Sequence, residues 1–267
     1  MDYSYLVGYK FGIIWEGEQT IEEYTIVSSN ANISKNEVSM DTLFVRSLYN
    51  KNKGDVCNSN GNNFIIKYIV CPSFDNIVKE RNIKYLYHFS ALENIDSIMQ
   101  NGILSIEMLR KLNIKYDFND NFRLDNHNSF ISCSIEFPNG ILLNNFKNKF
   151  EHKKKYVIFE IDIDVLNYKF AKCCSMNAAT MGGNFIVGID KLYTLYDGYR
   201  LNMPKSFPTS EQAEILVKDK IETSYIKKII FESENDEKDF KNKYNTIVNP
   251  KMFDYRDKFL GYKMKLN

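Results

Sequence analysis

The segment PTSEQAEILV, residues 208–217, contains the side chain best placed for chemistry. Its aliphatic second half is typical of a β-strand, in which alternate side chains share one face. Glu214 then lies on the same face as Gln212 and Leu216, on a rigid element that holds its carboxylate toward a cleft. Such a carboxylate can stabilise a developing positive charge or accept a proton. A single glutamate in a strand is more often a solvated surface residue, so this interpretation depends on partner groups elsewhere in the chain.

A second segment, residues 85–104, has the sequence YLYHFSALENIDSIMQNGIL. It predicts a short apolar strand that ends at His88, followed by a helix that begins at Ser90 and stops at Gly102. Ser90 and Glu93 have the S-x-x-E spacing of a capping box. A histidine at a strand end beside a helix N-terminus lies where the polar groups of a ligand are commonly bound. Taken alone, His88 is better explained as a structural histidine in the core or at the surface.

A third segment, residues 118–143, begins with a polar stretch that predicts a loop and continues as SFISCSIEF. The alternation in the second part predicts a strand with Ser132 and Ser134 on one face and apolar side chains on the other. Arg123 lies in the loop, and its planar guanidinium can donate paired hydrogen bonds to a pyrophosphate. A surface ion pair with a nearby aspartate is the alternative for Arg123 alone.

In their order along the chain, these segments resemble the DarT-type ADP-ribosyltransferases, which use NAD to modify a base in DNA. The residues that carry the resemblance are His88, Ser90, Asn94, Gly102, Ile103, Arg123, Ser132, Ser134, Pro138, Asn139 and the segment PTSEQAEILV. The resemblance covers about residues 85–231. It implies an α+β fold of the ADP-ribosyltransferase type, in which a split, mainly antiparallel sheet with flanking helices cradles NAD.

The resemblance also implies roles for individual residues. Glu214 and Arg123 would be catalytic, and the NAD-binding residues would be His88, Ser90, Asn94, Arg123 and Ser132. Transfer of ADP-ribose breaks a C–N glycosidic bond and develops positive charge on the ribose, which Glu214 can stabilise directly or orient through a ribose hydroxyl. The same carboxylate can take a proton from the attacking base nitrogen.

The connection before Glu214, residues 192–210, is rich in tyrosine and contains Arg200. In enzymes of this class the corresponding loop recognises the target, and aromatic rings can stack on a splayed base. The predicted substrate-binding residues are Tyr193, Tyr196, Tyr199, Arg200 and, within an asparagine–alanine sequence that resembles a family signature, Asn177. Ordinary packing remains the alternative for each tyrosine, and a turn remains the alternative for Asn177.

The implied function is modification of a base, thymine or guanine, in single-stranded DNA by the toxin of a toxin–antitoxin or phage-defence system. The expected antitoxin is an ADP-ribosyl hydrolase such as a macrodomain protein. Three alternatives stay open: a transferase that acts on RNA, a transferase that acts on protein, and a catalytically silent nucleic-acid or partner-binding module of the same fold.

Composition limits the partners. No apolar run among the 267 residues approaches the roughly 20 needed to cross a bilayer, and the N-terminus lacks the features of a signal peptide, so we expect a soluble, cytoplasmic protein without membrane contacts. Five cysteines without CxxC spacing and three scattered histidines predict buried thiols and no metal site. With a net charge of +1, nucleic-acid binding requires a local basic patch. The candidates are Lys147, Lys149, Lys153, Lys154 and Lys155, and in the tail Lys251, Arg256, Lys258, Lys263 and Lys265.

The chain is predicted to have two parts. Residues 1–79 form a small β-rich extension with strands near 5–14, 24–28 and 64–70 and a polar loop at 50–63. Residues 80–267 form the ADP-ribosyltransferase domain, with further scaffold strands at 155–165 and 226–231.

Overall fold

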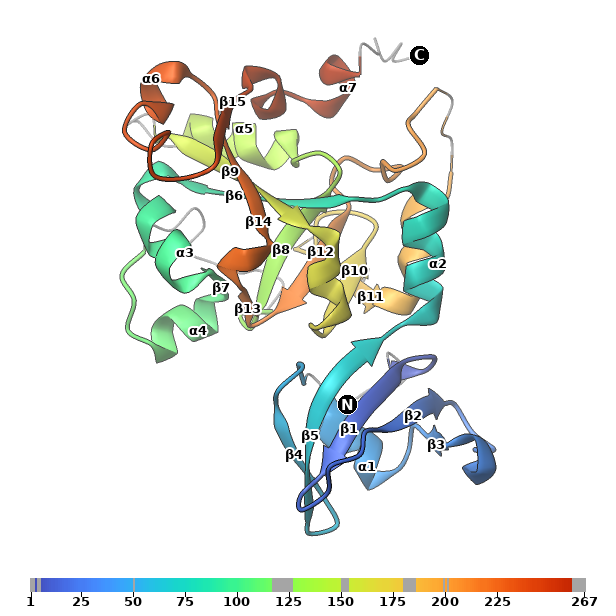
Figure 1. The fold of residues 1–267 in the computed structure, drawn as a ribbon. Coiled ribbons are helices and arrows are strands. Elements are labelled where there is room, and N and C mark those ends of the chain that lie inside the picture. Colours follow the sequence, from blue (N-terminus) through green and yellow to red (C-terminus); the bar gives the residue numbers. More distant parts are fainter. Residues whose placement is uncertain are drawn as a thin grey trace.

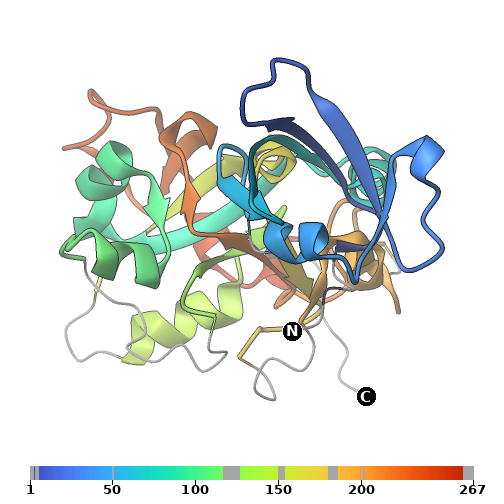
Figure 2. The same ribbon diagram turned by 90° about the horizontal axis from the view of Figure 1, so that it is seen from below.

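The computed structural model describes residues 3, 6–49, 51–116, 127–149, 154–179, 186–198, 200 and 202–260. Strands and helices are mixed in an α+β fold built on two main sheets (Figure 1). The sheet near the N-terminus lies below the larger sheet in Figure 1 and is seen from below, in blue, in Figure 2. Helix α2 (Pro72–Arg81) follows the last residues of the smaller sheet and contains the predicted boundary at residue 79, so the division into two domains stays a prediction.

The N-terminal sheet has five strands in the order β3-β2-β1-β5-β4. The strands are β1 (Lys10–Trp15), β2 (Glu22–Val27), β3 (Glu37–Ser39), β4 (Val56–Ser59) and β5 (Asn62–Val70), with η2 (Ile33–Lys35) and helix α1 (Leu43–Leu48) between them. Phe11, Ile13 and Phe64 are fully buried in its core. The sheet supports the prediction of a β-rich N-terminal part.

The polar run 50–63 is not one loop, and this prediction was wrong. Strand β4 and the start of β5 lie inside it and pair in antiparallel register, with Ser59 opposite Asn62. Asn60 and Gly61 form the two-residue turn, and both have a positive φ, of 53° and 85°. An Asn-Gly pair suits this turn because both central residues need the left-handed region. The polar residues on either side then belong to an edge hairpin.

The larger sheet has eight strands in the order β11-β10-β12-β8-β6-β9-β14-β15. They are β6 (Tyr85–Ala91), β8 (Phe130–Ile135), β9 (Tyr156–Asp162), β10 (Ala171–Cys174), β11 (Ile186–Gly188), β12 (Glu214–Lys218), β14 (Ile226–Phe231) and β15 (Thr246–Val248). All neighbours pair antiparallel except β14 with β15. The predicted mainly antiparallel sheet is therefore confirmed, and so are the strands expected at 155–165 and 226–231.

Helices surround this sheet (Figure 1). They are α3 (Ile95–Asn101), α4 (Ile106–Lys111), α5 (Gly140–Lys149), α6 (Glu234–Glu237) and α7 (Arg256–Phe259), with shorter turns η3 (Leu92–Asn94), η4 (Ile163–Asn167), η6 (Ile189–Tyr196), η7 (Thr223–Tyr225) and η8 (Pro250–Phe253). In the described part of the chain the longest helices have 10 residues, and none has the length and apolar character to span a membrane. All five cysteines are buried, as predicted.

The helix predicted to begin at Ser90 does not begin there. Strand β6 continues through Ser90 and Ala91, which pair with Val157 and Tyr156 of β9. Backbone pairing with β9 thus extends the strand past the S-x-x-E sequence, and Glu93 falls in η3. The side chain of Ser90 accepts a hydrogen bond from Nδ2 of Asn94 at 3.0 Å instead of capping a helix.

The larger sheet is split between β6 and β8. These strands pair only at Leu86–Ile135 and Tyr87–Ser134, whereas β6 pairs with β9 along its whole length, from Tyr85 to Ala91. Beyond Tyr87, strand β6 leaves β8, and the space between the two strands becomes available for other groups.

Gly102, between α3 and the short strand β7 (Ile103–Leu104), provides a test of the packing around this split. Strand β7 pairs with β13 (Lys220–Ile221), and a Cβ atom on Gly102 would lie 2.4 Å from the carbonyl oxygen of Ile221. Gly102 also has φ 85° and ψ 173°, a region that only glycine tolerates. We expect Gly102→Ala to lower the free energy of unfolding by about 1–3 kcal/mol in urea denaturation.

Gly17→Ala is the matched control. Gly17 has nearly the same φ, +86°, but nothing lies within 4 Å of its added Cβ. The difference between the two variants therefore measures what Gly102 adds beyond a positive φ, namely the contact with Ile221 and its extended ψ of 173°. Equal losses of stability would contradict this added cost.

Candidate active site

A cavity of about 610 Å³ lies at the split between β6 and β8. Its volume is within the range of about 300–1,000 Å³ typical of ligand pockets. Polar groups from several elements line it: His88, Ser90, Asn94, Ser132, Ser134, Asn139, Asn177, Gln212 and Glu214. The structure thus brings together six of the predicted catalytic and binding residues from widely separated positions, namely His88, Ser90, Asn94, Ser132, Asn177 and Glu214.

Glu214 is the first residue of β12, and its side chain is buried, with 4% exposed. Strand β12 lies between β10 and β8, where Glu214 is opposite Cys174 and Ser134. Its Oε2 accepts a hydrogen bond from the backbone N–H of Ala178 at 3.1 Å, and its Oε1 accepts one from Nδ2 of Asn177 at 3.3 Å. These donors hold the carboxylate in one orientation at the wall of the cavity.

Both ends of the Asn177 side-chain amide form hydrogen bonds. While Nδ2 faces Glu214, Oδ1 accepts a hydrogen bond from the backbone N–H of Ala179 at 2.9 Å. This is a local turn of the kind that asparagine favours. Asn177 is therefore a turn residue that contacts Glu214, and its predicted contact with substrate stays a prediction.

His88 bridges the gap between the separating strands. Its Nδ1 lies 2.9 Å from the carbonyl oxygen of Ser132 on β8. A carbonyl oxygen can only accept a hydrogen bond, so Nδ1 carries the proton and donates it. The histidine is thereby fixed in orientation beside the cavity.

Ser90 and Asn94 form a second buried polar pair on the β6 side of the cavity. They have 6% and 9% exposure and are joined by the 3.0 Å hydrogen bond between Asn94 Nδ2 and Ser90 Oγ. Both belong to the set predicted to bind NAD, and their position on the cavity wall is compatible with that role.

Asn139 joins β8 to helix α5. Its backbone N–H donates to Oγ of Ser134 at 2.9 Å, and its Oδ1 accepts from the backbone N–H of Leu142 at 3.0 Å. The second bond is a helix N-cap, which satisfies one of the free amides of the first turn. Asn139 thus positions the start of α5, which also contributes Leu142 and Phe146 to the cavity.

Glu136 was not identified from the sequence, yet it closes the paired end of β6 and β8. It has a positive φ of 60°, and its Oε1 accepts hydrogen bonds from the backbone N–H groups of Lys84 and, at 3.0 Å, Tyr85. Burial raises the pKa of the Glu136 carboxyl, and the two backbone donors act in the opposite direction. A left-handed glutamate whose side chain binds a distant backbone leaves no signal in the local sequence.

Of the residues predicted to bind the target, Asn177 lines the cavity, whereas Tyr193, Tyr196 and Arg200 are not among its lining residues. Tyr196 is buried, and its hydroxyl donates to the carbonyl of Ser206 at 3.1 Å. The guanidinium groups of Arg81 and Arg200 lie 5.0 and 5.1 Å from the centre of its ring. Tyr193 is 46% exposed. Tyr199 and Arg123 lie outside the described residues, so their predicted roles stay predictions.

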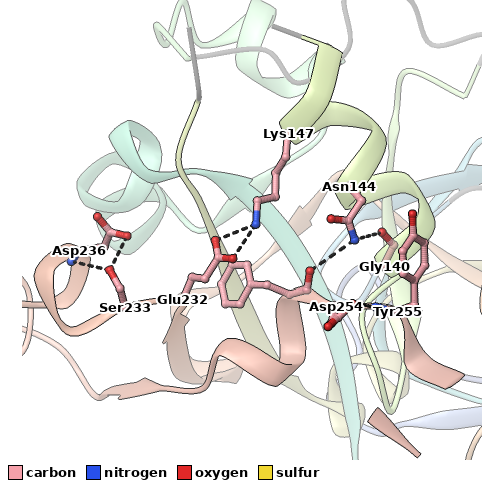
Figure 3. Close-up of polar contacts among 9 residues, drawn as sticks. Gly140, Asn144, Lys147, Glu232, Ser233, Asp236, Asp254 and Tyr255 are labelled. Carbon is pink, nitrogen blue, oxygen red and sulfur yellow. Dashed lines mark hydrogen bonds and ion pairs between the residues drawn. The ribbon is translucent and has the colours of Figure 1, made fainter. Parts of the chain in front are cut away.

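Some of the side chains proposed to form basic patches are buried or take part in ion pairs within the chain. Lys147 forms an ion pair with Glu232 at 2.6 Å (Figure 3). Lys155 forms an ion pair with Asp236. Arg256 is only 4% exposed, so its prediction as a surface residue was wrong; the reason is its burial against the loop before Glu214, which is described below. Lys153, Lys263 and Lys265 lie outside the described residues.

Within the residues that are described, no three His, Cys, Asp or Glu side chains gather to hold a metal ion.

Comparison with known proteins identifies one family. The family model described as "ssDNA thymidine ADP-ribosyltransferase, DarT" matches residues 87–254. This range contains every cavity residue named above. No curated protein sequence matches the chain significantly.

Three solved structures are similar to this chain at low identity. Thermosipho africanus DarTG in complex with ADP-ribose is 17% identical with a TM-score of 0.47, covering 64% of this chain and 51% of that chain. Thermus sp. 2.9 DarT in complex with NAD+ is 10% identical with a TM-score of 0.48, covering 63% and 96%. The same protein in complex with ADP-ribosylated ssDNA is 11% identical with a TM-score of 0.42, covering 63% and 95%. The chain spans about half the length of the Thermosipho protein.

The N-cap at Asn139 gives a test of how the cavity wall is built. Asn139→Ala removes the acceptor for the amide of Leu142, and we expect it to lower the free energy of unfolding by about 1 kcal/mol in urea denaturation. Asn139→Asp keeps the acceptor, so it should retain most of the stability. An Ala variant as stable as the wild type would show that Asn139 does not cap α5.

Proposed function

We propose a function from the premise that this chain belongs to the DarT family, which the match over residues 87–254 shows. The family is described as ssDNA thymidine ADP-ribosyltransferases. The proposed reaction is transfer of ADP-ribose from NAD to a thymine base of single-stranded DNA, and the family description favours thymine over guanine. The observation that carries the proposal is Glu214, a buried carboxylate held by two donors at the wall of a cavity of ligand size.

NAD is the proposed co-substrate. Thermus sp. 2.9 DarT is known in complexes with NAD+ and with carba-NAD+. In this chain we assign NAD to the cavity between β6 and β8, with His88, Ser90, Asn94 and Ser132 along the β6 and β8 walls. The fixed ring of His88 and the buried Ser90–Asn94 pair supply polar groups at defined positions, as recognition of a dinucleotide requires. Arg123 is assigned to the pyrophosphate by its resemblance to the family arginine.

The proposed chemistry follows from the carboxylate. The bond between the ribose C1′ and the nicotinamide nitrogen breaks, nicotinamide leaves with the bonding electrons, and positive charge develops on the ribose. The charge of Glu214 stabilises this state, in a buried site where such an interaction is stronger than in water. The thymine nitrogen then forms a bond to C1′ and loses its proton, for which Glu214 is the nearest proposed acceptor.

The DNA side of the site is assigned to the connection before β12. Tyr193, Tyr199 and Arg200 are the proposed contacts, with the exposed ring of Tyr193 available for stacking on a base. Tyr196 and Arg200 also support the loop from within, because the guanidinium of Arg200 donates to Oγ1 of Thr209 at 3.2 Å.

The biological role that we propose is that of a toxin in a toxin–antitoxin or phage-defence system. One similar structure is that of a DarTG protein in complex with ADP-ribose. The antitoxin expected for this chain is an ADP-ribosyl hydrolase, such as a macrodomain protein, that removes the modification. Coexpression with such a hydrolase should relieve growth arrest caused by this chain.

The first test is labelling with NAD. The wild type should transfer label to single-stranded DNA in preference to duplex DNA, single-stranded RNA or protein. Glu214→Ala and Glu214→Gln should lower transfer by at least about 100-fold, because both remove the negative charge near C1′. Glu234→Gln, at an exposed position on α6, is the control and should keep full activity.

The molecule that becomes labelled, whether DNA, RNA or protein, identifies the substrate. Label on RNA or on protein in place of DNA would replace the proposed substrate with another one. Wild-type transfer by a folded Glu214→Ala variant would remove Glu214 from the catalytic site.

A second test concerns NAD binding at His88. His88→Ala loses the hydrogen bond to Ser132 and the ring at the cavity wall, and we expect the NAD affinity measured by calorimetry to fall about tenfold, or roughly 1.4 kcal/mol. His88→Asn keeps a donor near the position of Nδ1 and should lose less. Unchanged NAD affinity in both variants would place His88 outside the NAD site.

A further inference from the structure

We propose that Arg256 and Glu211 are positioning residues that fasten the loop leading into Glu214, residues 208–213, to helix α5 and so set the DNA side of the active site. The inference rests on the proposed function, because it assigns these two residues to acceptor placement in that reaction. Arg256 lies in the C-terminal segment, residues 250–260, and is not among the residues that line the cavity.

Arg256 binds the loop through its side chain. Its Nη1 donates to the carbonyl of Pro208 at 2.7 Å and its Nη2 donates to the carbonyl of Thr209 at 3.0 Å. The guanidinium thus spans two consecutive peptide groups, and it is buried with only 4% of the residue exposed. A planar fork of donors can satisfy both carbonyls at once, whereas a lysine ammonium cannot match this geometry. Burial lowers the pKa of Arg256, and the neighbouring Glu211 and Asp257 oppose that effect.

Glu211 adds the connection to α5. A single carboxylate oxygen, Oε1, accepts hydrogen bonds from the backbone N–H of Arg256 at 3.0 Å and from that of Gly140 at 3.1 Å. Burial raises the pKa of Glu211, while the backbone donors and the charge of Arg256 lower it. One side chain therefore joins three segments that are distant in sequence: the loop, the first residue of α5 and the first residue of α7.

The approach of these segments leaves no room for change at Gly140. A Cβ atom there would lie 2.4 Å from the carbonyl oxygen of Asp254 and 2.7 Å from Oε1 of Glu211. On the next turn of α5, Nδ2 of Asn144 donates to the carbonyl of Phe253 at 3.4 Å and to that of Gly140 at 2.9 Å (Figure 3). The C-terminal segment thus packs closely against the start of α5, whose N-cap Asn139 lines the cavity.

These contacts lie on the acceptor side of the site. Only Gln212 and Ala213 separate Glu211 from Glu214, and Gln212 itself lines the cavity. The two carbonyls bound by Arg256, those of Pro208 and Thr209, belong to the last residues of the connection 192–210 that is proposed to contact DNA. The groups proposed to hold NAD, His88, Ser90 and Asn94, belong to β6 and η3 instead. Loss of the Arg256 contacts should therefore disturb DNA transfer while NAD binding persists.

The experiment uses the full chain and four variants, Arg256→Lys, Arg256→Met, Glu211→Gln and Glu211→Ala. The measurements are kcat and KM for a single-stranded DNA oligonucleotide at saturating NAD, the Kd for NAD by calorimetry, and the free energy of unfolding in urea. Arg46→Met, which alters an exposed arginine of α1 in the N-terminal sheet unit, is the control. All assays are run under conditions in which circular dichroism shows that the variant is folded.

We expect Arg256→Met and Glu211→Ala to lower kcat/KM for DNA by about 10–100-fold, because small misplacements of reacting groups cost up to about 100-fold in rate. Their Kd for NAD should stay within about threefold of the wild type. Glu211→Gln keeps a carbonyl oxygen at the Oε1 position and should recover most of the DNA activity. Arg256→Lys keeps the charge but loses the fork, and should lose about tenfold even where Arg256→Met does not fold.

Two results would overturn the inference. The first is wild-type DNA transfer by folded Arg256→Lys and Glu211→Ala, and the second is a parallel loss of NAD affinity and DNA transfer, which would indicate a general loss of structure. A wild-type chain that binds NAD but transfers nothing to DNA would instead overturn the proposed function, so the two failures are distinguishable.

Discussion

The separation of β6 from β8 after two residue pairs is the constraint on which the rest of the site depends. Backbone groups that leave a β-ladder need other partners, because an unpaired buried carbonyl or amide is costly. At this point the carbonyl of Ser132 on β8 accepts a hydrogen bond from the His88 ring at 2.9 Å. The His88 side chain thus replaces a backbone hydrogen bond that β6 no longer forms with β8. It also lines the cavity that the separation creates. The same side chain is the one proposed to bind NAD.

The carboxylate of Glu214 is subject to the complementary constraint. It is buried on a central strand, where an uncompensated charge would be expensive, and its compensation comes from the Asn177 side chain and the Ala178 backbone. Both donors belong to the turn after β10, the strand that pairs with β12 with Cys174 opposite Glu214. The turn that follows β10 therefore fixes the carboxylate on the neighbouring strand β12. This gives a preorganised negative charge at the cavity wall.

The sequence predicted what is encoded locally. Alternating apolar residues identified β8 and β9, and a histidine at a strand end pointed to the cavity, because such patterns depend on near neighbours. The asparagines were identified by the family resemblance. One error, the loop predicted at 50–63, missed a local signal, the Asn60–Gly61 turn of a hairpin. Two other errors arose where distant segments determine the structure. Ser90 looked like a helix cap but pairs with Val157 of β9, and Arg256 looked like a surface charge but binds Pro208 and Thr209. Neither contact leaves a trace in the residues around it, so only the folded chain reveals them.

The N-terminal sheet lies outside the residues matched to the family, yet it is joined to the strand that supports the site. Oδ1 of Asn52 accepts a hydrogen bond from the backbone N–H of Phe170 at 2.9 Å, and the backbone N–H of Lys53 donates to the carbonyl of Tyr168 at 3.1 Å. These contacts anchor the chain directly before β10 (Ala171–Cys174), and β10 leads on to Asn177. The N-terminal part is therefore bonded to the segment that leads into β10, the strand that pairs with β12 and precedes the Asn177 turn. Among the described residues, it contributes none to the cavity wall.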